Sequence, residues 1–469
     1  MLLFSFFSFF FISQLVLAYP TVRDANLTVE TYLTGLNNPT TMAFLGPDDI
    51  LVLEKDNGTV RRIQNGVLTE QPVLKVKIAN EKELGMLGID VIKRFSNAST
   101  NIYDVFLRFT EKGYDKEELL AFAISHLIQA IRQLQMGDPT GVDIQLSIAQ
   151  EQISAVLRLN DTLQEDESAA GRITNKLYKY TLTDNKDSHR YQMVGPEVIL
   201  NLPVNGSTSR HVGGVVAIDP TNTEHVYTTV GDLDISNRTK VQNFGDGSEP
   251  DGSAAILRTT SSGKTIGDGT GILGPQHPLD KYFAYGIRNS FGLAFDPLTG
   301  NLWNTENGPD FGDEINLVEP GFNSGWQKIM GLAPSGFNFS KDLVNFEGKG
   351  RYSDPEFVWH NVVAPTAILF LTSDNLGGDY RNDMFVAGSN NGKIYRFELN
   401  SDRTELLLPD ELADRVADIE NETEPLVFGN DFYAITDMKV GPDGNMYVVS
   451  FADGAIYRIQ HNNNNNNNN

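Results

Sequence analysis

One histidine of this chain stands where it could act as a base. His211, one of seven histidines, lies in RHVGGVVAIDP, residues 210–220, directly before two glycines and a short apolar run. A neutral imidazole can take a proton from a hydroxyl at ordinary pH, and a nearby carboxylate would orient the ring and stabilise its charged form. Asp232 ends the next apolar run, TTVGD, and is the candidate for that carboxylate. A packed structural histidine and a turn-capping aspartate remain the alternatives.

A cation and an amide precede a later apolar run in YGIRNSFGLAF. Arg288 offers a planar guanidinium and Asn289 a side-chain amide, and together they could hold an anionic or quinone-like oxygen. Spacing alone is equally consistent with a structural salt bridge of Arg288.

The stretch TENGPDFGDEINLVEPGFNSGWQ, residues 305–327, is rich in oxygen ligands. Four carboxylates surround its Gly308-Pro309 bend: Glu306, Asp310, Asp313 and Glu314. Because proline offers no competing N–H donor, a bent Gly-Pro loop can present successive carbonyl oxygens to a hard cation. Calcium is the natural candidate; EF-hand spacing is absent, and an ordinary acidic loop is the alternative.

A recurring strand–turn–strand unit would position these residues. It occurs at 41–63, 85–91 with the strand that follows, 213–232, 291–308, 366–399 and 436–459. Antiparallel units of this size cannot each close a core, but arranged radially they bury both faces against their neighbours. The pattern therefore predicts an all-β fold, a six-bladed β-propeller over residues 33–460. Two stacked β-sandwiches would not explain the recurrence.

Each repeat brings the residues just before its first strand to the same end of the propeller axis. This offset predicts a ring formed by Asn38 with Pro39, Glu83, His211, Arg288 with Asn289, Ala364 with Pro365, and Ala434 with Thr436. Convergent polar groups at such a mouth are typical of a ligand site.

Residues 115–168 depart from the repeat. Apolar residues at three- and four-residue spacing and strong helix formers predict two helices joined near Met136–Gly141, inserted in the second blade. An insertion this long should leave the propeller at a loop and pack on its surface or shield its mouth. We interpret its Leu/Ile stripe as a packing surface rather than a partner-binding face.

Composition excludes several classes of function. The formal net charge of −24 argues against nucleic-acid binding and supplies carboxylates for divalent cations. The chain has no cysteine, so disulfides do not stabilise it. Zinc-type His/Cys spacing, a G-x-S-x-G elbow, a Walker loop and a nucleotide-binding G-x-G-x-x-G are all absent, which leaves hydrolase and nucleotide-dependent functions without support.

The two ends of the sequence are not expected to belong to the propeller. Residues 1–18 are apolar and end in Val16-x-Ala18, the pattern of a signal peptide. An exported protein, secreted or periplasmic, is expected; an uncleaved N-terminal anchor stays open because a charged n-region is missing. The asparagine run at 462–469 is low-complexity sequence.

From about Leu33 to Ile459, apart from residues 115–168, the sequence resembles the quinoprotein sugar dehydrogenases of the glucose/sorbosone dehydrogenase family. Its landmarks are ELGMLGIDV, HVGGVVAIDP with TTVGD, the segment from YGIRNS to FNSGW, and DMKVGPDGNMYVV. The resemblance implies a soluble propeller enzyme in which pyrroloquinoline quinone (PQQ) lies over the channel mouth and calcium bridges it to the protein. It also implies oxidation of an aldose at its C1 hydroxyl to a lactone, with an external electron acceptor.

The resemblance assigns roles to matching residues. His211 matches the base and Asp232 its carboxylate partner, while Arg288 and Asn289 match residues beside the quinone. Calcium ligands are implied at four further positions: the backbone carbonyls of Gly308 and Pro309 at the cofactor, and the Glu314 side chain with the Ser324 carbonyl at a second, structural ion.

Some positions depart from the family. Arginines usually precede the last inner strand, where this chain has Ala434 and Thr436. Glu83 replaces a glutamine that often faces the cofactor, and as a carboxylate it would repel a tricarboxylate quinone unless it bound metal. Ile287 replaces a histidine. Lost cationic contacts could be restored by Lys393, Arg381 or Lys439.

Two other functions stay open. The propeller could have lost the quinone and act as a carbohydrate- or protein-binding module. A calcium-dependent lactonase has less support, because its metal needs acidic and amide side chains on the axis, where this ring offers only Glu83 and Asn289.

Overall fold

The computed structural model describes residues 18–113, 116–135, 173–186, 190–205, 207–234 and 238–462, with short pieces of 142–154. The predicted signal peptide up to residue 17, most of the second predicted helix and the asparagine run from residue 463 lie outside the described residues. Among those described, no helix is long and apolar enough to cross a membrane.

The described chain forms six sheets, whose inner strands follow one another in the sequence. The first sheet contains β3 (Pro39–Gly46), β4 (Asp49–Glu54), β5 (Thr59–Gln64), β6 (Val67–Leu68) and β7 (Leu74–Lys75). The second contains β8 (Met86–Ser96), β9 (Thr100–Lys112), β10 (Ile173–Asn185) and β11 (Arg190–Leu202). The third contains β12 (Val216–Ile218), β13 (His225–Val230), β14 (Ala255–Thr260), β15 (Tyr282–Tyr285), β19 (Phe322–Asn323) and β20 (Arg351–Tyr352).

The later sheets repeat this plan. The fourth contains β16 (Gly292–Phe295), β17 (Leu302–Glu306), β18 (Phe311–Val318), β21 (Phe357–Asn361) and β26 (Val416–Ala417). The fifth contains β22 (Pro365–Phe370), β23 (Met384–Gly388), β24 (Ile394–Leu399), β25 (Leu406–Leu407), β27 (Val427–Asn430) and β1 (Thr21–Val22). The sixth contains β28 (Ile435–Val440), β29 (Met446–Ser450), β30 (Ala455–His461) and β2 (Leu27–Leu33). Each predicted repeat thus falls on consecutive antiparallel strands of one sheet.

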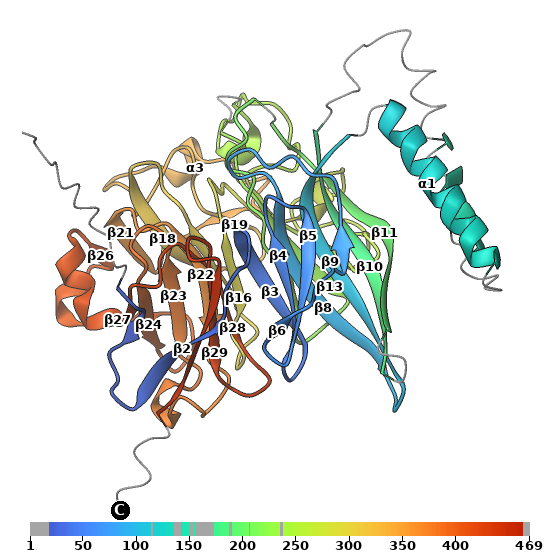
Figure 1. Ribbon diagram of the computed structural model, residues 1–469. Helices are drawn as coiled ribbons and strands as arrows, with labels where there is room; N and C mark the ends of the chain where they lie inside the picture. Colours follow the sequence, from blue (N-terminus) through green and yellow to red (C-terminus); the bar gives the residue numbers. More distant parts are fainter. Residues whose placement is uncertain are drawn as a thin grey trace, which may run out of the picture.

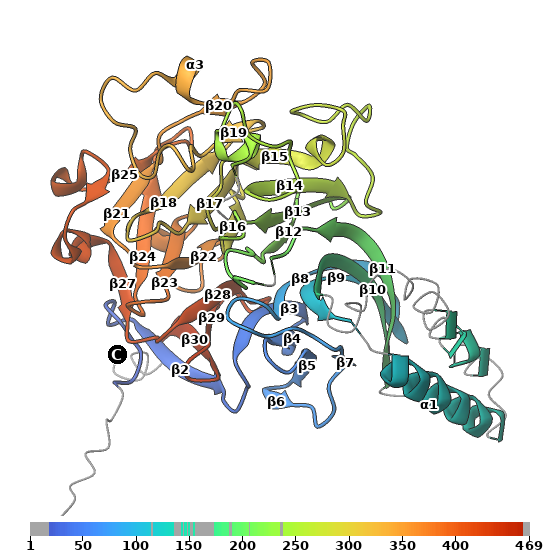
Figure 2. The same ribbon diagram turned by 90° about the horizontal axis from the view of Figure 1, so that it is seen from above.

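One strand of each sheet lies at the centre of the molecule (Figure 2). These inner strands are β3, β8, β12, β16, β22 and β28, and each contacts the next around the ring, β28 returning to β3. All six line one cavity of about 260 Å³. Apolar side chains fill the spaces between neighbouring sheets, which is the core expected of a propeller-like arrangement.

The N-terminal strands join the two ends of the chain. β1 pairs antiparallel with β27 in the fifth sheet, and β2 pairs antiparallel with β30 in the sixth. The last sheets are therefore built from both ends of the sequence, which ties the ring together without a disulfide.

The helix α1 (Lys116–Gln135) follows β9 and precedes β10 of the second sheet, and it lies at the outer edge of the molecule, away from the inner strands (Figure 1). Its Leu/Ile stripe does not pack as predicted: six aliphatic side chains from Leu120 to Leu134 are 38 to 67% exposed among the described residues. The buried positions are the small Ala123 and Ala130. The described residues also include helical pieces within 142–154 and the short helix α3 (Phe339–Asp342). Five 3-10 turns are found among them, at Lys240–Gln242, Leu279–Lys281, Gly378–Tyr380, Asp410–Leu412 and Glu420–Leu426.

Candidate functional site

The predicted ring positions lie at the entries of the inner strands. Four of them have left-handed backbone: φ is 47° at Asn38, 51° at His211, 52° at Ala364 and 43° at Ala434. This conformation costs a non-glycine residue about 1 kcal/mol or more. Because Asn38 and two alanines share it with His211, the turn recurs at four of the inner-strand entries and is not by itself a sign of catalysis.

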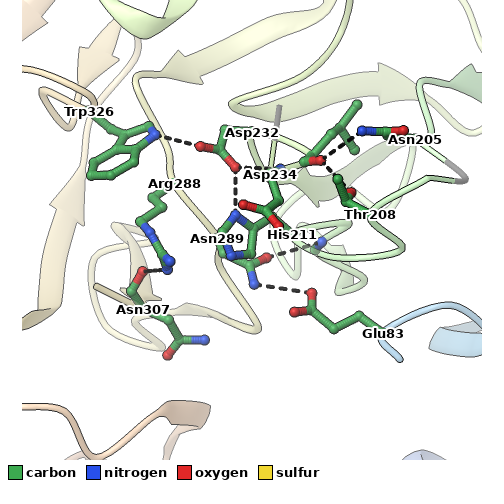
Figure 3. Close-up of polar contacts among 12 residues, drawn as sticks. Glu83, Asn205, Thr208, His211, Asp232, Asp234, Arg288, Asn289, Asn307 and Trp326 are labelled. Atoms are coloured by element: carbon green, nitrogen blue, oxygen red, sulfur yellow. Dashed lines mark hydrogen bonds and ion pairs between the residues drawn. The ribbon is translucent and has the colours of Figure 1, made fainter. Parts of the chain in front are cut away.

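His211 and Asp232 form the pair predicted from the sequence. His211 Nδ1 lies 2.6 Å from Asp232 Oδ1, and both side chains are buried. Trp326 donates its indole N–H to Asp232 Oδ2 at 2.7 Å, so both carboxylate oxygens are engaged (Figure 3). The Nδ1 contact leaves Nε2 of His211 as the nitrogen available to a substrate, since no described residue bonds it. The arrangement matches that of a carboxylate-oriented base.

Backbone contacts bring this pair to Arg288. Asp232 N–H donates to Arg288 O at 2.8 Å, and Leu233 N–H donates to His211 O at 3.2 Å. Gly231 sits between these segments: a Cβ there would lie 2.4 Å from His211 O and 2.7 Å from Arg288 O. Only glycine lets three chain segments approach this closely.

Arg288 and Asn289 lie beside the pair, as Figure 3 shows. Arg288 donates through Nη1 to Asn307 O at 2.7 Å and lies over the Trp326 ring at 5.5 Å from its centroid. Asn289 donates to Glu83 Oε2 at 3.2 Å and accepts from Gly213 N–H at 3.3 Å. The ring residues His211, Arg288, Asn289 and Glu83 therefore meet in one cluster.

Two polar atoms of this cluster are buried without a hydrogen-bond partner: Arg288 Nε and Asn307 Oδ1. Unsatisfied buried polar atoms are costly, and in native proteins they often mark the place of a water, an ion or a ligand. Arg288 and Asn307 therefore offer one hydrogen-bond donor and one acceptor that no described group satisfies.

The Gly308-Pro309 bend follows Asn307 directly, and Asp313 shapes it. Asp313 accepts backbone N–H groups from Gly308 at 2.8 Å, Val363 at 2.6 Å and Ala364 at 2.7 Å. Its oxygens are therefore used to hold the loop, whereas Asp310 is exposed. The predicted calcium contacts of Gly308 and Pro309 are backbone carbonyls, so Asp313 would act by holding the loop rather than as a ligand.

A pair of buried carboxylates lies behind the bend. Glu306 and Glu314 face each other across β17 and β18, and Ser324 donates to Glu306 at 2.7 Å and bonds Glu314 at 3.4 Å. Burial raises the pKa of Glu306 to about 7. Burial and the charge of Glu306 raise the pKa of Glu314 well above its ordinary value. Two buried acids held together in this way are stabilised by a cation.

Two asparagine side chains on the same strands add amide oxygens near this acidic pair. Asn304 and Asn316 form the cross-strand pair two residues along β17 and β18, on the same face as the two acids, and the Oδ1 atoms of both are buried without a partner. Oxygen-rich, partly unsatisfied surroundings suit calcium. Among the described residues, however, no three His, Asp or Glu side chains gather as a metal site, so a bound ion would need backbone or amide oxygens as well.

The three cationic side chains that the sequence suggested as substitutes are each paired with a carboxylate. Lys393 does not reach the cluster, because its ammonium pairs with Glu420 at 2.8 Å and Glu424 at 3.1 Å. Arg381 pairs with Asp374. Lys439 lines the central cavity but lies 3.4 Å from Asp437. Motif position alone could not reveal these carboxylate partners.

Four residues of the site were not foreseen as its members. Trp326 and Asn307 stand inside the recognised motif, but nothing local shows that they reach Asp232 and Arg288. Glu306 was noted only as an acid near the bend. Lys82 borders Glu83 and lines the cavity, and an exposed loop lysine carries no signal of its own.

The propeller-like fold and the histidine–aspartate pair agree with the family resemblance seen in the sequence. The chain belongs to the glucose/sorbosone dehydrogenase family, whose model matches residues 159–458, so the resemblance seen in the sequence is confirmed. It is 27% identical to the aldose sugar dehydrogenase YliI of Escherichia coli over 199 residues, 42% of this chain and 47% of that protein. It is 35% identical to quinoprotein glucose dehydrogenase B of Acinetobacter calcoaceticus over 108 residues, 20% of this chain and 22% of that protein. These matches span less than half of each relative.

Solved structures share the fold over nearly the whole chain. The apo form of the soluble aldose sugar dehydrogenase from Escherichia coli is 18% identical, with a TM-score of 0.60, over 93% of this chain and 100% of that one. The PQQ-bound aldose sugar dehydrogenase from Streptomyces coelicolor is 19% identical, with a TM-score of 0.55, over 94% of this chain and 99% of that one. At these identities the likeness concerns the architecture.

Proposed function

We propose that this protein is a PQQ- and calcium-dependent dehydrogenase that oxidises the C1 hydroxyl of an aldose to a lactone. It would do so on a six-bladed propeller with a helical insertion in the second blade, as an exported protein whose first residues form the signal peptide. The observation that carries the proposal is the buried His211–Asp232 pair, with Nε2 of the imidazole free of described partners.

The residues present fit the quinone and the metal at one side of the mouth. Arg288 Nε and Asn307 Oδ1 are a buried donor and acceptor without partners, which suits a polar ligand with oxygens and nitrogens at its edge. Calcium would be held by the carbonyls of Gly308 and Pro309, and a second ion by Glu314 with the Ser324 carbonyl. When bound, PQQ with calcium supplies the two-electron acceptor for hydride.

Side chains of the protein would then accept and stabilise the proton of the sugar hydroxyl. Nε2 of His211 takes the proton of the sugar's C1 hydroxyl while the C1 hydride leaves to the acceptor, so the alcohol becomes a lactone carbonyl. Asp232 stabilises the resulting imidazolium, and Trp326 fixes the carboxylate. Arg288 places a positive charge beside the reacting oxygens. The reduced site needs an external electron acceptor to return to its starting state.

A second function has a specific observation in its favour. Ala434 and Thr436 bring no charge to the last inner strand, and the substitutes Lys393 and Lys439 are paired with carboxylates. A propeller that binds a carbohydrate or a protein without a quinone would need none of these cations.

One titration separates the two functions. PQQ and calcium are added to the purified protein, followed by a panel of aldoses, while the quinone absorbance and the melting temperature are recorded. We expect the quinone to raise the melting temperature and an aldose to change the absorbance. No response to the quinone or to any sugar would favour the binding module.

A further inference from the structure

Three described cationic side chains line the central cavity: Lys55, Lys82 and Lys439. Their charges matter because a ligand that carries carboxylates must find cations to replace the water it loses on binding. The inner end of the sixth sheet does not provide them, since Ala434 and Thr436 stand there. A lysine that already pairs with a carboxylate of the protein is less available to a ligand, so the partners of the three lysines must be compared.

Lys439 is already neutralised. It lies 3.4 Å from Asp437, and although burial opposes its charge, Asp437 and Asp90 raise its pKa. It also lies three residues beyond Thr436 along β28, about 10 Å into the channel. Asp437 in turn accepts from Thr41 Oγ1 at 2.7 Å and from Met42 N–H at 3.0 Å. These contacts fix Asp437 to β3, and Lys439 is paired with that fixed carboxylate.

Lys55 is similarly engaged. Its ammonium lies 2.7 Å from Asp56 and 3.2 Å from the carbonyl of Asn80, and its side chain is only 11% exposed. Moving Lys55 towards a ligand would take the cation from Asp56 and leave that carboxylate with the Asn38 amide.

Lys82 differs from both. Its ammonium donates to one neutral group, the carbonyl of Thr208, at 2.8 Å, and its side chain is exposed. It pairs with no carboxylate among the residues that the structure describes. A hydrogen bond to a carboxylate is roughly twice as strong as one to a neutral carbonyl, so Lys82 can exchange its present contact for a better one.

The loop that carries Lys82 is docked on the segment that leads into His211. Glu83 N–H donates to Ser209 O at 3.1 Å, and Thr208 Oγ1 donates to Leu233 O at 2.9 Å, next to Asp232. Figure 3 shows Thr208 and Glu83 on the same side of the cluster as His211. Lys82 is therefore held at the rim of the cavity, beside the base and two blades away from β28.

We propose that Lys82 binds a carboxylate of the molecule that occupies the mouth, and so fixes that molecule with its anionic edge towards the second blade. The proposal rests on the proposed function in taking this molecule to be a carboxylated quinone. Glu83 opposes this contact, because its carboxylate lies at the same rim. The orientation is thus set by one attractive and one repulsive charge in adjacent residues.

The test measures binding without turnover. PQQ and an uncharged ortho-quinone, phenanthrenequinone, are titrated in calcium against the wild type, Lys82→Gln, Glu83→Gln and the control Lys341→Gln on the exposed surface of α3. We expect Lys82→Gln to weaken PQQ about three- to tenfold and to leave phenanthrenequinone unchanged. Glu83→Gln should strengthen PQQ alone, and added salt should weaken PQQ in the wild type more than in Lys82→Gln.

The outcomes separate the two proposals. If the wild type binds PQQ and Lys82→Gln binds it equally well, the role of Lys82 is wrong while the dehydrogenase proposal stands. If the wild type binds neither quinone, both are wrong. If Lys82→Gln lowers the affinity for both quinones equally, the substitution has altered the structure of the mouth. That result would also overturn the charge-based role of Lys82. Melting temperatures of all variants, and recovery of PQQ binding by Lys82→Arg, establish that the fold is intact.

Discussion

Nδ1 of His211 lies 2.6 Å from an oxygen of Asp232, and the second oxygen of that carboxylate receives the indole N–H of Trp326. The imidazole is therefore held by a carboxylate that cannot rotate freely. An ionised carboxylate can only accept a hydrogen bond from Nδ1, so this contact favours the tautomer in which an unprotonated Nε2 faces the substrate. This relationship supports the proposed role of His211 as the proton acceptor.

Replacing His211 by alanine should abolish most of the turnover and leave quinone binding nearly intact. A positioned base contributes about 10²- to 10⁴-fold to the rate, so kcat with an aldose should fall by that factor. Quinone affinity, measured by absorbance titration, should change less than twofold. His225→Ala is the control, because His225 begins β13 of the same sheet, at the opposite end of that strand from Asp232. Equal losses of kcat and quinone affinity would mean that His211 is structural.

Substitutions of Asp232 and Trp326 should both slow proton transfer to His211, and the substitution of Asp232 should slow it more. Asp232→Asn removes the charge that stabilises the imidazolium, so kcat should fall about 10²-fold or more. Trp326→Phe removes one hydrogen bond to a charged group and should lower kcat about tenfold. Steady-state kinetics at saturating aldose measure both. A Trp326→Phe variant as slow as Asp232→Asn would show that the indole does more than orient the carboxylate.

The sheets could be predicted because their signals are local. Residues 436–459 contain two hairpins with Asp-Gly turns, and β28 to β30 follow them closely. Counting back from each inner strand then placed Glu83 and Asn289 in one ring, although they are 206 residues apart. A repeated unit carries long-range information that a single unit cannot.

Other parts of the site depend on contacts between segments that no motif connects. Trp326 donates to Asp232, which is 94 residues away in the sequence. Lys393 forms ion pairs with Glu420 and Glu424, and these two acids lie in a 3-10 turn outside any repeat. The exposed Leu/Ile stripe of α1 was wrongly expected to pack, because periodicity reveals that a face is apolar and not what lies against it.

Calcium should stabilise the protein through Glu314. A cation relieves the repulsion between two buried carboxylates, and at a concentration 100 times its Kd it would add about 2.7 kcal/mol to the free energy of unfolding. Melting curves with calcium and with a chelator measure this difference. Glu314→Gln should shrink the calcium-dependent shift, whereas Glu319→Gln, an exposed acid beyond the same strand, should keep it. An unchanged shift in Glu314→Gln would contradict a calcium site at this residue.

Gly231 should be required for the geometry of the site rather than for the fold as a whole. A Cβ at this position would press on the carbonyls of His211 and Arg288, so Gly231→Ala must move the base, the guanidinium or both. A misplacement of about 1 Å can cost about 10²-fold in rate, and we expect kcat/KM for an aldose to fall by about this factor. Gly46→Ala is the matched control, because a Cβ there meets no atom within 4 Å. Activity of Gly231→Ala close to that of Gly46→Ala would show that the three segments can separate without loss, and that the close approach of His211 to Arg288 is not needed for catalysis.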